Sequence, residues 1–306
     1  MQAMLLAAGL GTRLWPLTDL RPKPIVPVAN KPLGAFAMEH LARGGVSRII
    51  ANTHPQPEKV ETVLKAACPE GVELLFSREA ELLGTGGGLR KARPLFAASQ
   101  SSVIVMNGDT LFAPDLARAL AEHESRGAVA TMILRRTPEP ARFGAIGVDR
   151  TGCVRSLLGT PPREDVCEEL MFTGVHILSP LAFAAMPESG CVIRSAYRRW
   201  VDEAALVLGI VDESPWADLG TIAEYHRVNL ELASGSLTWP GVSACDGCIL
   251  PDGLAGSAQI RRSVVGEGAR LEPGVCLDRC VVWPGVVVDR SARNAVITAA
   301  HRVVVN

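Results

Sequence analysis

The chain has 306 residues, of which 48% are hydrophobic and 21% are charged, and its formal net charge is −1. A chain of this length can bury a large core and favours two domains over one. Because the net charge is close to zero, an anionic ligand would have to be held by local positive charge. We therefore expect a globular protein that binds neither nucleic acid nor a membrane surface.

The absence of targeting signals in the sequence and the cysteine pattern both predict a cytoplasmic protein. No apolar run approaches the roughly 20 residues that cross a bilayer, and the first residues enter a strand pattern without a basic segment or cleavage site. Eight cysteines fit this compartment if they are reduced. A zinc site is one interpretation of the pairs near the C-terminus, but packing in a strand-rich core is the one we favour. These paired residues are Cys245, Cys248, Cys276 and Cys280.

A glycine turn follows the first apolar run of the chain. Met4 to Ala8 predict a buried strand, and Gly9-Leu10-Gly11 predict a tight turn after it. Glycines let backbone N–H groups approach an anion, so the turn could hold a phosphate, with Arg13 and Lys23 adding positive charge. A plain strand-to-helix turn is the alternative, and this motif alone does not decide between the two.

Helix and strand patterns alternate along most of the chain. We expect helices at 35–43, 58–67, 89–96, 114–122 and 222–233. We expect strands at 47–51, 72–76, 102–106, 129–134, 154–158, 172–178 and 207–211, with a hairpin turn at 149–152. The alternation predicts an α/β, Rossmann-like fold with a mixed, mostly parallel sheet, whose ligands bind at the carboxyl ends of the strands.

A second glycine cluster, Gly84-Thr85-Gly86-Gly87-Gly88, precedes the helix expected at 89–96. Three consecutive glycines make a poor start to a helix unless something approaches the backbone closely there. A flat ring that lies on the backbone is one candidate, and a flexible loop is the alternative.

Two aspartates follow strand patterns. Asp109 comes after the clearest buried strand, and Asp218 follows the strand expected at 207–211. A carboxylate at the carboxyl end of a strand can hold Mg²⁺ against phosphate oxygens, although either residue could instead cap the helix that follows it. His176 is expected to be packed or hydrogen-bonded within the sheet, and not to act as a catalytic base.

The pattern changes after Ser234-Gly235-Ser236. Short apolar segments recur every six residues at Val265, Leu271 and Leu277, and again at Val282 and Val288. This period predicts a short left-handed parallel β-helix, with a small β-sandwich as the alternative. We therefore expect an α/β domain at 1–234 and a β-helix domain at 235–306.

Leu6 to Leu14, followed by Pro22-Lys23-Pro24, resembles the signature of the sugar-1-phosphate nucleotidyltransferases, also called NDP-sugar pyrophosphorylases. A hexapeptide solenoid is also a common C-terminal appendage in this family. Five further motifs arrive in the family's order: Gly84-Thr85-Gly86-Gly87, Asn107-Gly108-Asp109, Phe143-Gly144, Phe172-Thr173-Gly174 and Trp216-x-Asp218-x-Gly220-Thr221. A P-loop and a dinucleotide site fit less well, because Thr12-Arg13 follows Gly11 and Leu14 stands where a third glycine would be.

The resemblance implies attack of a sugar-1-phosphate oxygen on the α-phosphorus of a nucleoside triphosphate (NTP), with release of pyrophosphate. Arg13, Lys23 and Asp109 would be catalytic, with Arg13 on the outgoing pyrophosphate and Lys23 between the α-phosphate and the sugar phosphate. Asp109 and Asp218 would hold Mg²⁺. The implied nucleotide site comprises Ala8, Gly9, Gly11, Thr12, Arg13, Gly84, Thr85, Gly86, Gly87 and Asn107. The implied sugar-phosphate site comprises Lys23, Gly144, Thr173 and Gly174.

One family motif is missing. Many members carry Glu-Lys-Pro after the hairpin, where the Glu reads sugar hydroxyls and the Lys holds the sugar phosphate, but Arg155 to Pro162 contain no such triplet. Arg142, Arg163 or Arg194 could supply the cation. The glycine run is closer to the branch that handles N-acetylmuramic acid or heptose phosphates than to the glucose-1-phosphate thymidylyl branch. The sequence itself names neither the base nor the sugar.

Two other functions were weighed against this reaction. A catalytically silent sugar-nucleotide sensor that regulates a paired enzyme would be expected to lose the charged site residues, which this chain retains. An acyltransferase built on the β-helix would need a histidine base, and His301 is the single histidine after residue 234. A solenoid is better suited to assembly, so a homo-oligomer formed through the C-terminal part is expected.

Overall fold

The computed structural model describes residues 1–97, 101–160, 163–252, 254 and 259–305. The chain forms two compact units, each built from two segments of sequence. The first unit comprises Met1–Gly9 and Gly34–Trp216, and the second comprises Leu10–Leu33 and Ala217–Asn306. The expected domain boundary after residue 234 stays a prediction. No helix among the described residues is long and apolar enough to cross a membrane.

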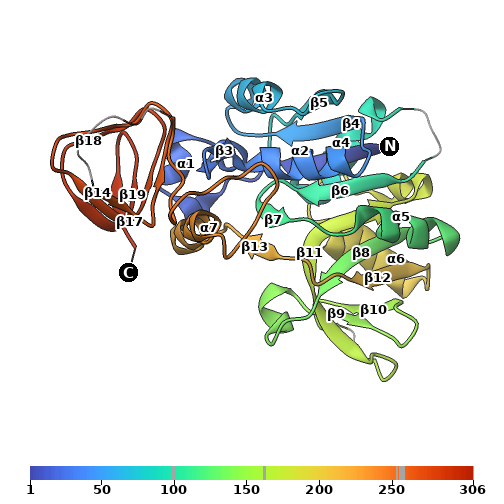
Figure 1. Cartoon of the computed structure of the whole chain (residues 1–306). Helices are drawn as coiled ribbons and strands as arrows, with labels where there is room; N and C mark the ends of the chain where they lie inside the picture. Colours follow the sequence, from blue (N-terminus) through green and yellow to red (C-terminus); the bar gives the residue numbers. More distant parts are fainter. Residues whose placement is uncertain (98–100, 161–162, 253, 255–258, 306) are drawn as a thin grey trace. The chain divides into compact units, whose positions relative to one another are not determined.

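A nine-stranded sheet forms the centre of the first unit (Figure 1). Its main path runs β10-β9-β11-β6-β1-β4-β5, and β8 pairs with both β11 and β12. The strands are β1 (Gln2–Ala7), β4 (Arg48–Thr53), β5 (Glu73–Arg78), β6 (Val103–Asn107), β8 (Ala130–Arg135), β9 (Ile146–Val148), β10 (Val154–Leu157), β11 (Glu168–Leu178) and β12 (Val207–Val211).

The sheet is mixed, as expected, but it is not mostly parallel. Strands β6, β1, β4 and β5 pair in parallel, and so do β8 and β12. In contrast, β11 pairs antiparallel with β6, β8 and β9, and β10 pairs antiparallel with β9. The expected hairpin at 149–152 accounts for the β9–β10 pair, because a short turn can join only antiparallel strands.

The helices of the first unit lie close to their expected positions, except that one begins earlier than expected and the short helix at 198–202 was not expected. They are α2 (Leu33–Arg43), α3 (Pro57–Ala66), α4 (Gly84–Ala92), α5 (Leu116–Ser125) and α6 (Arg198–Asp202). The helix expected at 89–96 already begins at Gly84 and is followed by a 3-10 turn at Arg93–Leu95. The core gathers apolar residues from five strands of the sheet, Met4, Ile50, Val105, Leu134 and Leu178.

The N-terminal part of the second unit consists of short elements, and the helix α7 (Ile222–Ser234) is well capped at both ends. Helix α1 spans Leu17–Leu20, and strands β2 (Pro27–Val28) and β3 (Lys31–Pro32) form a small antiparallel hairpin. Thr221 and Glu224 form a capping box at the start of α7, and Gly235 ends the helix in the left-handed conformation. The helix end expected at Ser234-Gly235 is therefore confirmed.

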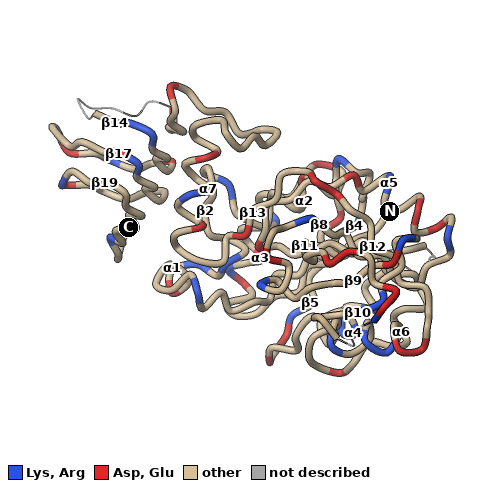
Figure 2. The backbone as a smooth tube through the Cα atoms, turned by 90° about the horizontal axis from the view of Figure 1, so that it is seen from below, with Lys and Arg blue, Asp and Glu red and all other residues tan. Residues whose placement is uncertain are grey.

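Short strands fill the C-terminal part of the second unit. They are β14 (Gln259–Arg261), β15 (Val264–Val265), β16 (Arg270–Leu271), β17 (Cys276–Val282), β18 (Val287–Val288), β19 (Ala292–Ile297) and β20 (Arg302–Val304). Strands β14, β17 and β19 stack side by side in parallel (Figure 2), but β20 pairs antiparallel with β19, so the sheet is mixed. The left-handed β-helix and the homo-oligomer stay predictions.

The C-terminal cysteines divide by burial. Cys248 and Cys280 are buried, in keeping with a packing role, whereas Cys245 and Cys276 are exposed. The packing interpretation is therefore wrong for the exposed pair. Among the described residues, no group of three or more histidine, cysteine or acidic side chains is placed to hold a metal ion.

Candidate active site

In the second unit, the chain turns at Gly11, and Lys23 packs directly against this glycine. Gly11 has a φ of +63° at the start of the turn Thr12–Leu14, and a Cβ added there would lie 2.9 Å from the Cβ of Lys23. Lys23 itself begins the 3-10 turn Lys23–Ile25 and is only 5% exposed. The position therefore needs glycine for its backbone conformation and for the close approach of the lysine.

Arg13 and Asp218 face each other in the same unit. Arg13 Nη2 lies 4.0 Å from Asp218 Oδ2, and the arginine side chain is 67% exposed against 19% for the aspartate. A Cβ at Gly220 would lie within 3 Å of both side chains, at 2.7 Å from Asp218 Oδ2 and 2.8 Å from Arg13 Nη2. An exposed guanidinium in so loose an ion pair can turn toward a ligand at little cost.

Neither aspartate caps the helix that follows it. Asp115 caps α5, because its side chain accepts a hydrogen bond from the Arg118 amide at 2.9 Å. Thr221 caps α7. The alternative in which Asp109 and Asp218 serve as helix caps is therefore wrong. Their carboxylate oxygens have the donor chemistry that Mg²⁺ prefers.

Asp109 belongs to the first unit, next to the carboxyl ends of β1 and β6. The amide of Gly108 donates to the Leu6 carbonyl at 2.9 Å, which ties the Asn107-Gly108-Asp109 turn to the end of β1. Gly9 follows the same end of β1, and no atom lies within 4 Å of a Cβ added to it. The turn and Gly9 thus share the sheet edge where ligands of parallel strands bind.

Residues expected around the sugar lie in the first unit, and they differ in exposure. Gly174 has a φ of +88°, and a Cβ there would lie 2.5 Å from the Asn107 amide, so these two predicted site residues are brought together. Thr173 is 1% exposed and its hydroxyl donates to the Ile133 carbonyl at 2.7 Å. The Thr173 hydroxyl therefore uses its proton in a hydrogen bond within the sheet, next to Gly174. Gly144 ends a 3-10 turn with a φ of +78°.

The second glycine cluster is the first turn of α4, so the flexible-loop alternative is wrong. The segment that approaches its backbone is part of the same unit, residues 187–190. A Cβ at Gly86 would lie 2.5 Å from Pro187 Cγ, and one at Gly87 would lie 2.5 Å from the Glu188 carbonyl oxygen. Close packing within the chain therefore already requires these glycines, whether or not a nucleotide ring also lies nearby.

Hydrogen bonds lock this packing in place. The Gly86 amide donates to the Gly190 carbonyl at 2.8 Å, and the Gly190 amide donates to the Leu83 carbonyl at 2.7 Å. The Thr85 hydroxyl accepts from the Val192 amide at 2.9 Å. Thr85, expected to contact the nucleotide, is thus placed as a bridge to the facing segment.

Two buried polar residues that no sequence motif had marked join both glycine motifs. Asn52 Oδ1 accepts from the Ala7 amide at 2.7 Å, and Asn52 Nδ2 donates to Glu79 Oε1 at 2.7 Å. Glu79 Oε2 accepts from the Leu83 amide at 2.9 Å. Asn52 is 3% exposed and Glu79 is 4% exposed. A signal was present, because polar residues stand at or just after the ends of two neighbouring parallel strands, β4 and β5.

His176 is packed in the sheet, as expected. It is 1% exposed, and its Nδ1 lies 2.7 Å from the Tyr197 hydroxyl. Burial lowers the pKa of His176 to about 3, so the ring is neutral at physiological pH. A neutral, buried histidine bonded to a tyrosine is a structural residue.

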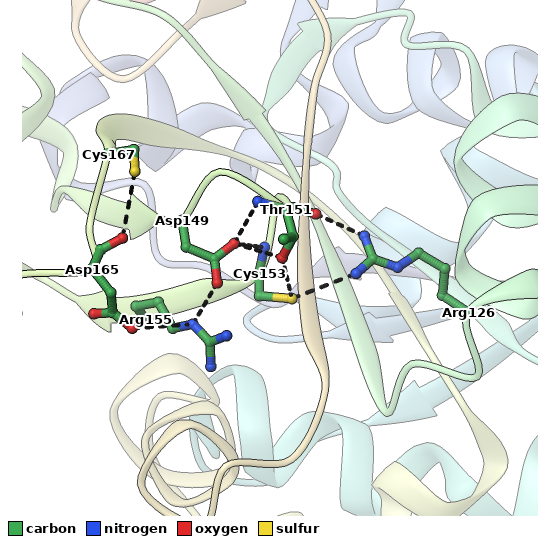
Figure 3. A network of polar contacts seen from close by, with 7 residues as sticks. All are labelled: Arg126, Asp149, Thr151, Cys153, Arg155, Asp165 and Cys167. Atoms are coloured by element: carbon green, nitrogen blue, oxygen red, sulfur yellow. Dashed lines mark hydrogen bonds and ion pairs between the residues drawn. The ribbon is translucent and has the colours of Figure 1, made fainter.

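Arg155, where the Glu-Lys-Pro triplet is missing, is held by its own hairpin (Figure 3). Its Nε donates to Asp149 Oδ2 at 2.7 Å and lies 3.5 Å from Asp165 Oδ2. Burial alone would raise the pKa of Asp149, but hydrogen bonds from Thr151, Arg155 and Cys153 together outweigh it and lower the pKa to about 2. Arg155 therefore stabilises the β9–β10 hairpin.

A pocket of about 320 Å³ opens beside this hairpin in the first unit. It is lined by Ser156, Gly159, Arg163, Val166, Cys167, Glu168 and Glu169. Of the three candidate cations, Arg163 is the one that lines this pocket. Arg142 lies over the Phe143 ring, 5.4 Å from its centroid, and Arg194 is exposed in the turn Ile193–Tyr197. Pro161 and Pro162 lie outside the described residues.

The chain combines a mixed α/β sheet, a glycine turn, a buried lysine and carboxylates in strand-end motifs, which is a set of features typical of phosphate-binding α/β proteins. Comparison with known proteins makes the class specific: the chain belongs to the nucleotidyl transferase family, whose model matches residues 2–235.

Relatives of known name cover nearly the whole chain. Mannose-1-phosphate guanylyltransferase of Mycobacterium tuberculosis is 31% identical over 294 residues, which cover 94% of this chain and 81% of the relative. UTP–glucose-1-phosphate uridylyltransferase of Synechocystis is 26% identical over 318 residues, with 95% and 82% covered. A solved structure described as a glucose-1-phosphate thymidylyltransferase of Bacillus anthracis shares the fold, with a TM-score of 0.64 at 20% identity over 75% of this chain and 94% of that one.

Proposed function

We propose that the protein transfers a nucleotidyl group from an NTP to a sugar-1-phosphate and releases pyrophosphate. The observation that carries this proposal is the set of charged residues retained in a chain of this family. Arg13, Lys23, Asp109 and Asp218 all stand at the family's motif positions, and the relatives that cover this chain almost fully are named for such reactions.

The residues suit a reaction between two anions. A sugar phosphate must approach a triphosphate, so catalysis consists mainly of positioning and of neutralising charge, without a protein nucleophile. Lys23 is a buried cation that packs against Gly11, and it would bridge the α-phosphate and the incoming sugar phosphate. Arg13, which is exposed and loosely paired, would hold the departing pyrophosphate.

A magnesium ion would be held by Asp109 and Asp218. Its chemistry would be to reduce the repulsion between the phosphates and to orient the leaving group. Support for this assignment comes from the side chains themselves, since both are carboxylates in strand-end motifs and neither caps a helix.

Arg163 would supply the cation on the sugar side in place of the family's missing lysine. It lines the pocket that also contains Gly159, within the stretch where the triplet is absent. Gly144 and Gly174 would line the sugar. The names of the relatives make mannose-1-phosphate with GTP and glucose-1-phosphate with UTP the first pairs to test, followed by N-acetylmuramic acid and heptose phosphates.

Pyrophosphate release from a panel of NTPs and sugar-1-phosphates tests the proposal. We expect turnover with at least one pair, and we expect Asp109→Ala and Lys23→Ala to abolish it. Arg199→Ala is the matched control, because it removes an exposed cation of α6 that pairs with Glu203 four residues away. Unchanged turnover in both site variants contradicts the mechanism, and tight nucleotide binding without turnover by the wild type indicates the regulatory subunit instead.

A further inference from the structure

The segment that carries Lys23 is anchored on both sides to one distant residue, Trp283. On one side, the Arg21 guanidinium lies over the Trp283 ring, 5.5 Å from its centroid. On the other side, the Pro27 carbonyl accepts a hydrogen bond of 2.6 Å from the Tyr225 hydroxyl, which in turn accepts one of 3.0 Å from Trp283 Nε1. All of these residues belong to the second unit.

The anchor is buried, so water cannot replace its contacts. Tyr225 is fully buried and Trp283 is 4% exposed. Burial raises the pKa of Tyr225, so the hydroxyl keeps its proton and can donate to Pro27 while it accepts from Trp283. Removing either partner would leave a buried polar atom without its hydrogen bond.

The hairpin that follows Lys23 is held in the same way. Its turn residues Ala29 and Asn30 both have positive φ, at 44° and 66°. The Ala29 amide donates to Asn229 Oδ1 of α7 at 2.9 Å, and Asn30 Nδ2 donates to the Val265 carbonyl of β15 at 2.9 Å. Helix α7 and the C-terminal strands therefore fix the chain on both sides of the lysine.

We propose that Trp283 and Tyr225 are positioning residues that place Lys23 for phosphate contact. The inference rests on the proposed function of Lys23. The charge of a lysine sits at the end of a flexible side chain, so the position of its ammonium group relative to a phosphate depends on where the backbone is held. A displacement of about 1 Å at a reacting group can cost roughly 100-fold in rate. The C-terminal strands would thus contribute to catalysis without touching a substrate.

Two conservative variants isolate the anchor. Tyr225→Phe keeps the ring and removes both hydrogen bonds, and Trp283→Phe keeps an aromatic face for Arg21 but removes the donor. We expect kcat to fall roughly 10- to 100-fold in each, with KM for both substrates changed by less than roughly 3-fold.

Ser263→Ala is the matched control within the C-terminal strands. The Ser263 hydroxyl is fully buried, accepts from the Cys280 amide at 3.0 Å and donates to the Arg261 carbonyl at 2.6 Å. These hydrogen bonds do not reach residues 21–30. Its loss should lower the melting temperature as much as Tyr225→Phe does, with kcat unchanged.

Amide hydrogen exchange separates the anchor from the proposed reaction. Tyr225→Phe should speed exchange of the amides within 23–28 that carry a hydrogen, those of Lys23, Ile25, Val26 and Val28, and Ser263→Ala should not. Unchanged exchange together with unchanged kcat overturns the proposal, and so does a fall in kcat without faster exchange of these amides. If the wild type turns over no substrate pair, the proposed function fails, and faster exchange at 23–28 would still support the anchoring of the lysine segment.

Discussion

Replacing Gly87 with alanine tests whether the second glycine cluster is required for packing. A Cβ at Gly87 would lie 2.5 Å from the Glu188 carbonyl oxygen and 2.9 Å from both Leu83 Cβ and Ser189 Cα. Two of these three contacts are backbone atoms, which cannot rotate away as the end of a flexible side chain could. The segment 187–190 would therefore have to move away from α4.

The expected cost follows from these contacts. Alanine gains about 1 kcal/mol over glycine within a helix. Overpacking costs about 1–3 kcal/mol, and movement of the segment weakens the paired hydrogen bonds between Gly86, Leu83 and Gly190, worth about 1 kcal/mol each. We expect the free energy of unfolding to fall by about 1–3 kcal/mol in total.

Urea unfolding followed by circular dichroism measures this change, with Gly9→Ala as the matched control. Because nothing lies within 4 Å of a Cβ at Gly9, its stability should stay within about 0.5 kcal/mol of the wild type. Turnover of Gly9→Ala should nevertheless fall if the first glycine turn cradles the triphosphate. A Gly87→Ala protein as stable as the wild type, with nucleotide affinity reduced, would refute the packing argument and favour ligand contact.

Further predictions concern polar groups. In Glu79→Gln, the side-chain amide would place an N–H against one of two donors, Asn52 Nδ2 or the Leu83 amide, and so would lose a hydrogen bond. This change should lower the free energy of unfolding by about 1–3 kcal/mol, measured by urea titration. The pKa of Asp149 is lowered from 3.8 to about 2, so its ionised form adds stability above pH 4 that is lost as the pH falls toward 2. The free energy of unfolding of Asp149→Asn should therefore be about 1–2 kcal/mol lower than that of the wild type at pH 7. Between pH 4 and pH 2, the variant's free energy of unfolding should fall less than that of the wild type. Arg163→Ala should raise KM for the sugar phosphate roughly 10-fold, with KM for the NTP unchanged, whereas Arg194→Ala should change neither. Chelation with EDTA should abolish pyrophosphate release and added Mg²⁺ should restore it; turnover that survives chelation contradicts the metal assignment.

Local sequence patterns predicted most of the regular elements of the first unit. Strand periodicity placed the core of the sheet, because buried strands give apolar runs that need no knowledge of their partners. The mixed pairing and the structural role of His176 also followed from the sequence. The large share of antiparallel pairs did not, because strand direction across β11 depends on which strands become neighbours.

The errors arose where a residue's partner is distant in the chain. The glycines of α4 looked unsuited to a helix because Pro187 and Gly190, which press against them, lie about a hundred positions away. Asn52, whose partners Ala7 and Glu79 are 45 and 27 positions away, was missed for the same reason. The helix caps were open alternatives until Asp115 and Thr221 were seen to fill those roles. Cap geometry, unlike periodicity, depends on a single hydrogen bond.

The position of Trp283 has an evolutionary consequence. It lies beyond residue 235, where the match to the family ends, yet it contacts both Arg21 and Tyr225 within that match. A C-terminal segment grafted from a relative without tryptophan at the position of residue 283 would not supply this ring. Such chimeras should be stable but slow, and among homologues the residue types at 21, 225 and 283 should covary. The C-terminal strands would then be inherited together with the signature loop and would not be exchanged as an independent module.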